Sequence, residues 1–153
     1  MQRRALFLYL ISIALKSQEL LRRLRFYSNF LLPFSKPAQN SKVYLFKEQS
    51  HPGRVVVAHK KHVSEILELT PQERAAYLEE IAKVSEAIHK IFKPAKVNYG
   101  AYGDTGHHLH FHLVPKYTDE YEWGGTFEMN PGKKFLSDEE YAEMIEKIKS
   151  ELV

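Results

Sequence analysis

Three histidines, His108, His110 and His112, alternate with apolar residues in the stretch HHLHFHLVPKY. Side chains along a β-strand point to opposite faces with a period of two, so a strand here would carry all three imidazoles on one face. Histidine titrates close to neutral pH and can donate, accept, bind a metal or attack as a nucleophile. The pattern therefore predicts a strand with one face in the core and one face suited to chemistry.

The spacing of the imidazoles favours one kind of ligand. Alternate residues of a strand stand about 6.6 Å apart, which matches an extended anionic chain such as a polyphosphate. The middle ring, that of His110, would then face the reacting phosphorus. A row of histidines with a purely structural role is an alternative, although imidazoles are costly to bury without partners.

A metal site is a second alternative. His108 and His112 would stand about 13 Å apart along a strand, so all three rings cannot converge on one ion bound at about 2.1 Å. Two neighbouring rings could do so with help from another histidine of the chain, the candidates being His51, His59, His62 and His107.

A glycine-rich segment leads into the histidine strand. Residues 98–106, NYGAYGDTG, contain three glycines whose backbone N–H groups could approach phosphate oxygens closely. Asn98 and Thr105 offer further donors. Since this turn feeds directly into the histidines, both features together predict a phosphate site.

The remaining elements must position this strand. Short apolar runs at residues 43–46, 54–58, 96–99 and 108–114 predict strands, with turn residues between them. Thr70, Pro71 and Glu73 form the start signal of a helix that ends before the third strand, and Ser137 with Glu140 begins a second helix. One helix between strands favours an α+β fold with a mainly antiparallel sheet, packed against two helices. The apolar positions of the helices are Tyr77, Ile81, Val84, Ile88, Ile91, Tyr141, Met144, Ile145, Ile148 and Leu152.

Composition limits the class of protein. The chain has 153 residues, a net charge of +3 and no cysteine, which fits one folded domain and excludes disulfides, thiolate metal sites and cysteine nucleophiles. The basic residues are scattered except near the N-terminus, so we expect no specific nucleic-acid binding.

Residues 1–41 differ from the rest. An apolar run after MQRR is too short to span a bilayer, and the basic amphipathic segment that follows predicts a helix, with residues 30–41 as a linker. We expect an extra helical extension in residues 1–41 and one domain in residues 42–153. A cytoplasmic location is expected, while a membrane-surface or targeting role of residues 1–27 stays open.

The stretch from His108 to Val114 resembles the histidine triad (HIT) motif of nucleotide hydrolases and transferases. The resemblance extends upstream through VYLFKEQSHPGRVVVAHKKHV and LTPQERAAYL, and covers residues 42–117 well. It implies that His110 is the nucleophile that forms a covalent nucleotidyl-histidine, that His112 holds the phosphate and assists the leaving group, and that His108 orients the row. Asn98 resembles the phosphate-side asparagine of the family.

Two residues depart from the family pattern. Many members carry a histidine after the Pro-Gly of the first hairpin, where this chain has Arg54, a permanent cation that could clamp phosphate. Asp104 stands where glutamine is common, and its carboxylate would repel phosphate unless it forms an Asx turn. We expect phosphate contacts from Asn98, Asp104, Thr105 and Arg54.

The expected activity is cleavage of a phosphoanhydride or phosphoramidate bond in a nucleotide, with a dinucleoside polyphosphate or a nucleoside phosphoramidate as substrate. The resemblance further implies a homodimer, and we expect no cofactor and no bound metal. A nucleotide-binding or scaffolding module with little turnover is the alternative, for which Arg54 and Asp104 are the strongest arguments.

Overall fold

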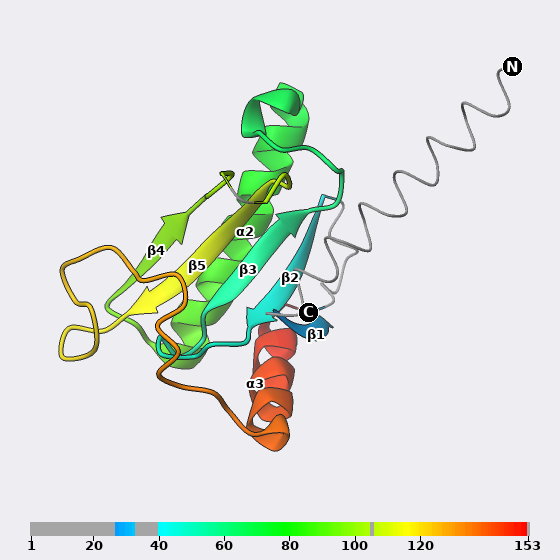
Figure 1. Ribbon diagram of the computed structural model, residues 1–153. Helices are drawn as coiled ribbons and strands as arrows, with labels where there is room; N and C mark the ends of the chain where they lie inside the picture. The colour runs from blue at the N-terminus through cyan, green and yellow to red at the C-terminus, as the bar shows by residue number, and fades with distance from the viewer. Residues whose placement is uncertain (1–26, 33–39, 105, 153) are drawn as a thin grey trace, which may run out of the picture.

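One antiparallel sheet organises the chain in the computed structural model, which describes residues 27–32, 40–104 and 106–152. Within these ranges five strands follow the order β1-β2-β3-β5-β4 (Figure 1). The strands are β1 (Tyr27–Leu32), β2 (Ser41–Phe46), β3 (Val55–His59), β4 (Lys96–Gly100) and β5 (His110–Lys116). The helices are the short 3₁₀ helix η2 (Ile66–Glu68), α2 (Pro71–Phe92) and α3 (Asp138–Glu151). The predicted α+β fold with a mainly antiparallel sheet is confirmed.

Helix α2 connects β3 to β4 and packs along one face of the sheet, as Figure 1 shows. Val43, Leu45, Val55 and Val57 point to this face from β2 and β3, because paired residues of antiparallel strands share a face. The sheet and both helices bury one continuous core. Its helical members include Tyr77, Ile81, Val84, Ile88, Tyr141, Ile145 and Ile148, with Ile91 and Met144 packed against its edge.

Both predicted helix starts are confirmed. Thr70 caps α2 by accepting a hydrogen bond from the Glu73 N–H, and the Glu73 side chain returns one to the Thr70 backbone. Ser137 and Glu140 form the same capping box at α3. Each box satisfies N–H groups that have no partner inside the helix.

The segment before β2 differs from the sequence prediction. Residues 27–32, assigned to the end of a basic helix and the start of a linker, form strand β1 instead and pair with β2. The stretch is rich in aromatic and apolar residues, which favour strands, and the free edge of β2 offers it backbone partners. The predicted helix upstream lies outside the described residues.

The histidine strand begins later than predicted, at His110 rather than His108. The two preceding residues lie beside the end of β3, but their backbone hydrogen bonds do not continue the regular ladder of the sheet. The Leu109 N–H donates to the Val63 carbonyl at 2.7 Å, and the Leu109 carbonyl accepts from the His59 N–H at 2.9 Å. A bond to the loop after β3 therefore replaces the regular ladder at this point.

No helix in the described part of the chain is long and apolar enough to cross a membrane.

Candidate active site

The histidines and the apolar residues of this stretch lie on opposite faces of the sheet, as their alternation predicts. Leu109 and Leu113 lie in the core, and Phe111 packs against it. The ladder pairs His110 with Ala58 and His112 with Val56 on β3, so both imidazoles occupy the sheet face opposite α2. The strand thus has the predicted core face and a second face that carries histidines.

His108 anchors the segment that precedes β5. Its ring nitrogen Nε2 lies 2.7 Å from the carbonyl oxygen of His59, and its Nδ1 lies 3.3 Å from Nδ1 of His62. A carbonyl only accepts, so Nε2 of His108 carries a proton. Burial lowers the pKa of His108 below its ordinary value, which favours the neutral ring.

His110 is the half-buried member of the row, between two buried histidines. Its Nδ1 lies 2.7 Å from the carbonyl oxygen of His108, to which it must donate. In the neutral ring Nε2 then keeps its lone pair. The ring of His110 meets that of His112 edge-on, with 5.1 Å between the centroids.

His112 is almost completely buried, with 1% of its surface exposed. The rings of Phe46, Tyr102 and Phe127 surround it at centroid distances of 5.5, 6.2 and 6.1 Å. Burial lowers the pKa of His112 to about 3, and the nearby charge of Arg54 acts in the same direction. His112 is therefore a neutral group near pH 7.

Arg54 lies beside His112 rather than at the surface. Its side chain is fully buried, and its guanidinium lies 3.8 Å from the centroid of the Phe46 ring. Nη2 donates to Nδ1 of His112 at 3.3 Å, and Nη1 donates to the carbonyl of Met129 at 2.9 Å. The segment after β5 covers the guanidinium, and the phosphate clamp expected of Arg54 stays a prediction.

The hairpin between β2 and β3 holds Arg54 in this place. Gly53 adopts a φ of +87°, and a Cβ there would lie 2.5 Å from the ring of Phe92, so only glycine fits. The amide of Gln49 accepts from the Gly53 N–H at 2.9 Å and donates to the Arg54 carbonyl at 3.1 Å. The turn is therefore fixed by backbone geometry and by a buried side chain.

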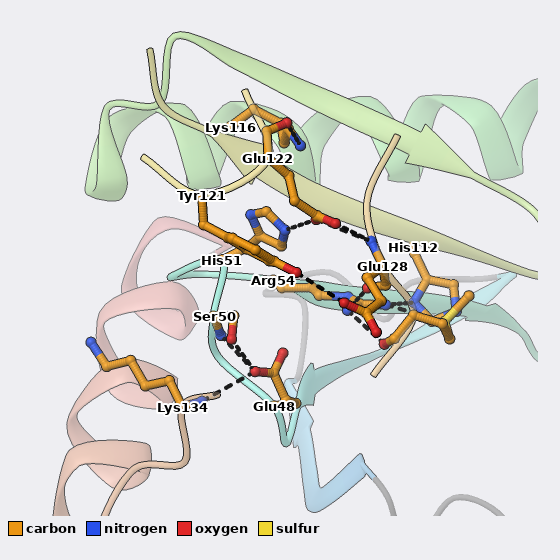
Figure 2. A network of polar contacts seen from close by, with 11 residues as sticks. Glu48, Ser50, His51, Arg54, His112, Lys116, Tyr121, Glu122, Glu128 and Lys134 are labelled. Carbon is orange, nitrogen blue, oxygen red and sulfur yellow. Dashed lines mark hydrogen bonds and ion pairs between the residues drawn. The ribbon is translucent and has the colours of Figure 1, made fainter. Parts of the chain in front are cut away.

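Polar contacts tie the segment after β5 to the same hairpin (Figure 2). The carboxylate of Glu122 accepts from Nε2 of His51 at 2.9 Å and from the backbone N–H of Glu128 at 3.0 Å. Burial lowers the pKa of His51 although the Glu122 carboxylate opposes it, which favours the neutral ring in this contact. Lys116 donates to the Glu122 carbonyl. These bonds hold the carbonyls of residues 128 and 129 against Arg54.

The remaining predicted site residues lie at different places relative to the histidines. Asn98 is half-buried on β4, and its pairing with Val114 places it on the same sheet face as His112. Asp104 is exposed in the bend between β4 and β5. Gly106 lies close to the site, since a Cβ there would be 4.0 Å from Cε1 of His110. Thr105 lies outside the described residues.

Sequence reasoning missed the aromatic surroundings of His112. Tyr102 lies within the glycine-rich turn, so its position there was a usable signal, whereas nothing in the sequence near Phe127 pointed to the site. Gly100 makes room for both, because a Cβ there would lie 2.6 Å from Tyr102 and 2.9 Å from Phe127. This glycine serves close packing of rings rather than a left-handed backbone.

Within residues 27–32, 40–104 and 106–152, no group of three or more histidine, aspartate or glutamate side chains is placed to hold a metal ion. Of the histidines considered as extra ligands, His51 contacts Glu122 and His62 contacts His108. His59 accepts from the Lys61 N–H at 3.1 Å, and its ring packs edge-on against Tyr77.

The model of the HIT domain matches residues 38–119, which is more than half of the chain. The chain belongs to the HIT family. The match spans β2 to β5, and with them the hairpin and the three histidines. The resemblance inferred from the motif is thus confirmed, and the family is one of nucleotide-binding proteins and hydrolases.

Solved structures of HIT proteins share the fold. A histidine triad protein from Sinorhizobium meliloti superposes with a TM-score of 0.75 at 20% identity, covering 85% of this chain and 93% of that one. A histidine triad protein from Bradyrhizobium japonicum superposes with a TM-score of 0.71 at 21% identity, covering 83% of this chain and 98% of that one. A hypothetical histidine triad nucleotide-binding protein from Sulfolobus tokodaii superposes with a TM-score of 0.62 at 21% identity, covering 80% of this chain and 84% of that one. No curated protein matches the chain.

Proposed function

We propose that this HIT protein cleaves a phosphoanhydride or phosphoramidate bond of a nucleotide through a covalent nucleotidyl-histidine at His110. The observation that carries the proposal is the 2.7 Å contact between Nδ1 of His110 and the His108 carbonyl. This contact directs the other ring nitrogen, with its lone pair, away from the backbone. A fixed, neutral imidazole of partial exposure is the form that attacks phosphorus.

The reaction would proceed in two displacements. Nε2 of His110 attacks the α-phosphorus, the bond from phosphorus to the leaving oxygen or nitrogen breaks, and the leaving group takes up a proton. Water then attacks the phosphorus of the intermediate and gives up a proton, which balances the proton taken up by the leaving group. The bond from phosphorus to Nε2 breaks, so that a nucleoside monophosphate leaves and the neutral imidazole is restored. Splitting the displacement in this way lowers the barrier of each step.

Neighbouring groups would hold the substrate. Asn98, on the same face as His112, is a candidate donor to the phosphate, and the backbone from Gly103 to Gly106 could approach its oxygens closely. Thr105 and Asp104 are part of the same proposed contact region. Because a carboxylate repels phosphate, we assign Asp104 to shaping the turn.

The assembly would be a homodimer. Among the described residues β4 pairs only with β5, so its outer edge is available to a second copy. Antiparallel pairing of two β4 edges would continue the sheet across a two-fold axis. The cytoplasm, where nucleotide substrates occur, is the location that we propose.

Mass spectrometry of the quenched reaction tests the proposal. The protein is mixed with adenosine 5′-phosphoramidate or a diadenosine polyphosphate, quenched within one turnover and weighed intact. We expect one adenylyl group on the parent protein and none on His110→Asn, with His89→Asn, an exposed position on α2, as control. Nucleotide binding without an adduct or product would favour the binding-module alternative.

A further inference from the structure

We propose that Arg54 is a positioning residue that fixes His112 in the tautomer with its proton on Nε2. In that form His112 presents a neutral N–H donor to the phosphate beside His110. The inference rests on the proposed function for its catalytic meaning, but the tautomer itself can be measured without any substrate.

The first step is the chemistry of the two partners. A guanidinium has five N–H donors and no acceptor, and it does not lose its charge in proteins. The contact of 3.3 Å between Nη2 of Arg54 and Nδ1 of His112 therefore requires Nδ1 to accept. A neutral imidazole that accepts at one nitrogen carries its proton on the other. The proton of His112 is thus on Nε2.

The second step is that the arginine is held in place. Its side chain is fully buried, and Phe46 lies against the face of the guanidinium. The carbonyl oxygens of Met129 and Glu128 accept from Nη1 at 2.9 and 3.5 Å. Since a planar fork bonded on one side has little freedom on the other, Nη2 stays aimed at His112.

The third step concerns the charge state. Burial and the cation of Arg54 both disfavour protonation of His112, whose pKa falls to about 3. Near neutral pH, His112 can then act on a phosphate only as a neutral donor. A histidine in place of Arg54 could either donate or accept, and would leave both tautomers of His112 open. The arginine removes that freedom.

The consequence for the site is a division of labour between two neighbouring rings. A backbone carbonyl directs the bare Nε2 of His110, and an arginine directs the protonated Nε2 of His112. One ring offers a lone pair and the next offers a hydrogen, with 5.1 Å between their centroids. This pairing suits attack on a phosphorus whose oxygen is held by the second ring.

The test is ¹⁵N NMR of protein labelled on histidine, at pH 7 and without ligand. We expect His112 of the parent protein to be wholly protonated at Nε2, and Arg54→Met, which keeps a long apolar side chain but cannot donate, to show both tautomers. An Nδ1–H signal from His112 of the parent protein would overturn the inference, even if the variant fails to fold. So would an unchanged His112 tautomer in a folded Arg54→Met.

Kinetics with adenosine 5′-phosphoramidate add a second readout. Arg54→Met should lower kcat by roughly 10 to 10²-fold, while KM changes little. The upper end is the loss expected when a single hydrogen-bond donor to a developing oxyanion is removed. Arg74→Met is the matched control, because Arg74 also donates to a backbone carbonyl, that of Leu69, but away from the site. A fall in kcat that is the same in both variants would show a merely structural effect.

The two proposals fail separately. A parent protein with the Nε2–H tautomer of His112 but without an adenylyl adduct would refute the covalent mechanism and leave the role of Arg54 in ordering His112 intact. An adduct at His110, together with a His112 tautomer that does not depend on Arg54, would refute the role of Arg54 and leave the covalent mechanism intact.

Discussion

Nδ1 of His110 lies 2.7 Å from the carbonyl oxygen of His108, two residues earlier in the chain. The bond is local, and the chain that supplies the carbonyl is anchored to other parts of the structure. The ring of His108 reaches the carbonyl of His59, and the Leu109 backbone bonds to the loop after β3. The first histidine of the row thus acts on the second through its backbone, and the following predictions use this relationship.

The three histidines should differ in the damage that their loss causes. His110→Asn should abolish turnover and the adduct together while nucleotide binding survives, because the attacking atom is gone and a smaller polar group remains. His112→Asn should lower kcat on the order of 10² to 10³-fold, as loss of a positioned donor does. His108→Asn should be mildest, since the carbonyl that orients His110 is retained and the Leu109 backbone bonds still anchor the segment. Single-turnover rates of the purified variants measure this order.

A metal mechanism predicts another order of damage. If one ion were held by two of the three rings, losing either ligand should be equally severe and should release the ion. Equal loss in His108→Asn and His110→Asn, with stoichiometric metal in the parent protein by elemental analysis, would contradict the nucleophile assignment.

Acid should destabilise the protein partly through His112. Its pKa is about 3 when folded and near 6.5 when unfolded, so between these values the unfolded chain binds more protons. Stability must then fall as the pH falls below about 6.5, with a slope of about 1.4 kcal/mol per pH unit for one full proton. His112→Asn should reduce the dependence of the unfolding free energy on pH by the contribution of close to one proton. Urea unfolding between pH 4 and 6 measures this slope.

The rest of the acid sensitivity should remain in that variant. Burial also lowers the pKa of three other histidines, His51, His59 and His108, which act in the same direction. His89→Asn, exposed on α2, controls for the substitution itself. A slope that does not change in His112→Asn would mean that this ring is protonated in the folded protein.

Packing of the rings around His112 can be tested at Gly100. A Cβ at this position would lie 2.6 Å from the Tyr102 ring and 2.9 Å from Phe127, so Gly100→Ala must displace them. Since small displacements in an active site cost up to about 10²-fold, kcat/KM should fall well beyond any loss of stability. Gly125→Ala is the control, because the nearest neighbour of a Cβ there would be 4.0 Å away. Equal activity of the two variants would show that the rings do not shape the site.

The proposed dimer can be tested at the edge of β4. Tyr99 is 52% exposed on this strand, and two-fold pairing of the β4 edges would bring the two copies of it near each other. Tyr99→Glu should therefore shift the mass by light scattering from dimer to monomer at micromolar concentration. Phe135→Glu, at another exposed aromatic just before α3, should stay dimeric. A monomeric parent protein would refute the dimer.

The sequence by itself determined what depends on local pattern. Helix caps at Thr70 and Ser137 are readable because a capping box joins residues three apart, within one turn. The period of two in residues 108–114 sets which side chains enter the core, and the same pattern indicated the family. Strand β1 was missed because it forms by pairing with the available edge of β2, and its own sequence has no clear period of two.

Only the tertiary structure decided the roles of the charged and aromatic groups. From the sequence Arg54 was a permanent cation that could clamp phosphate, and in the structure the pairing of β2 with β3 sets it against Phe46, while the segment after β5 covers it. Phe127 reaches His112 from a separate segment. Burial, tautomer and pKa depend on which groups meet in space, because desolvation and hydrogen bonding act over a few ångströms whatever the separation along the chain.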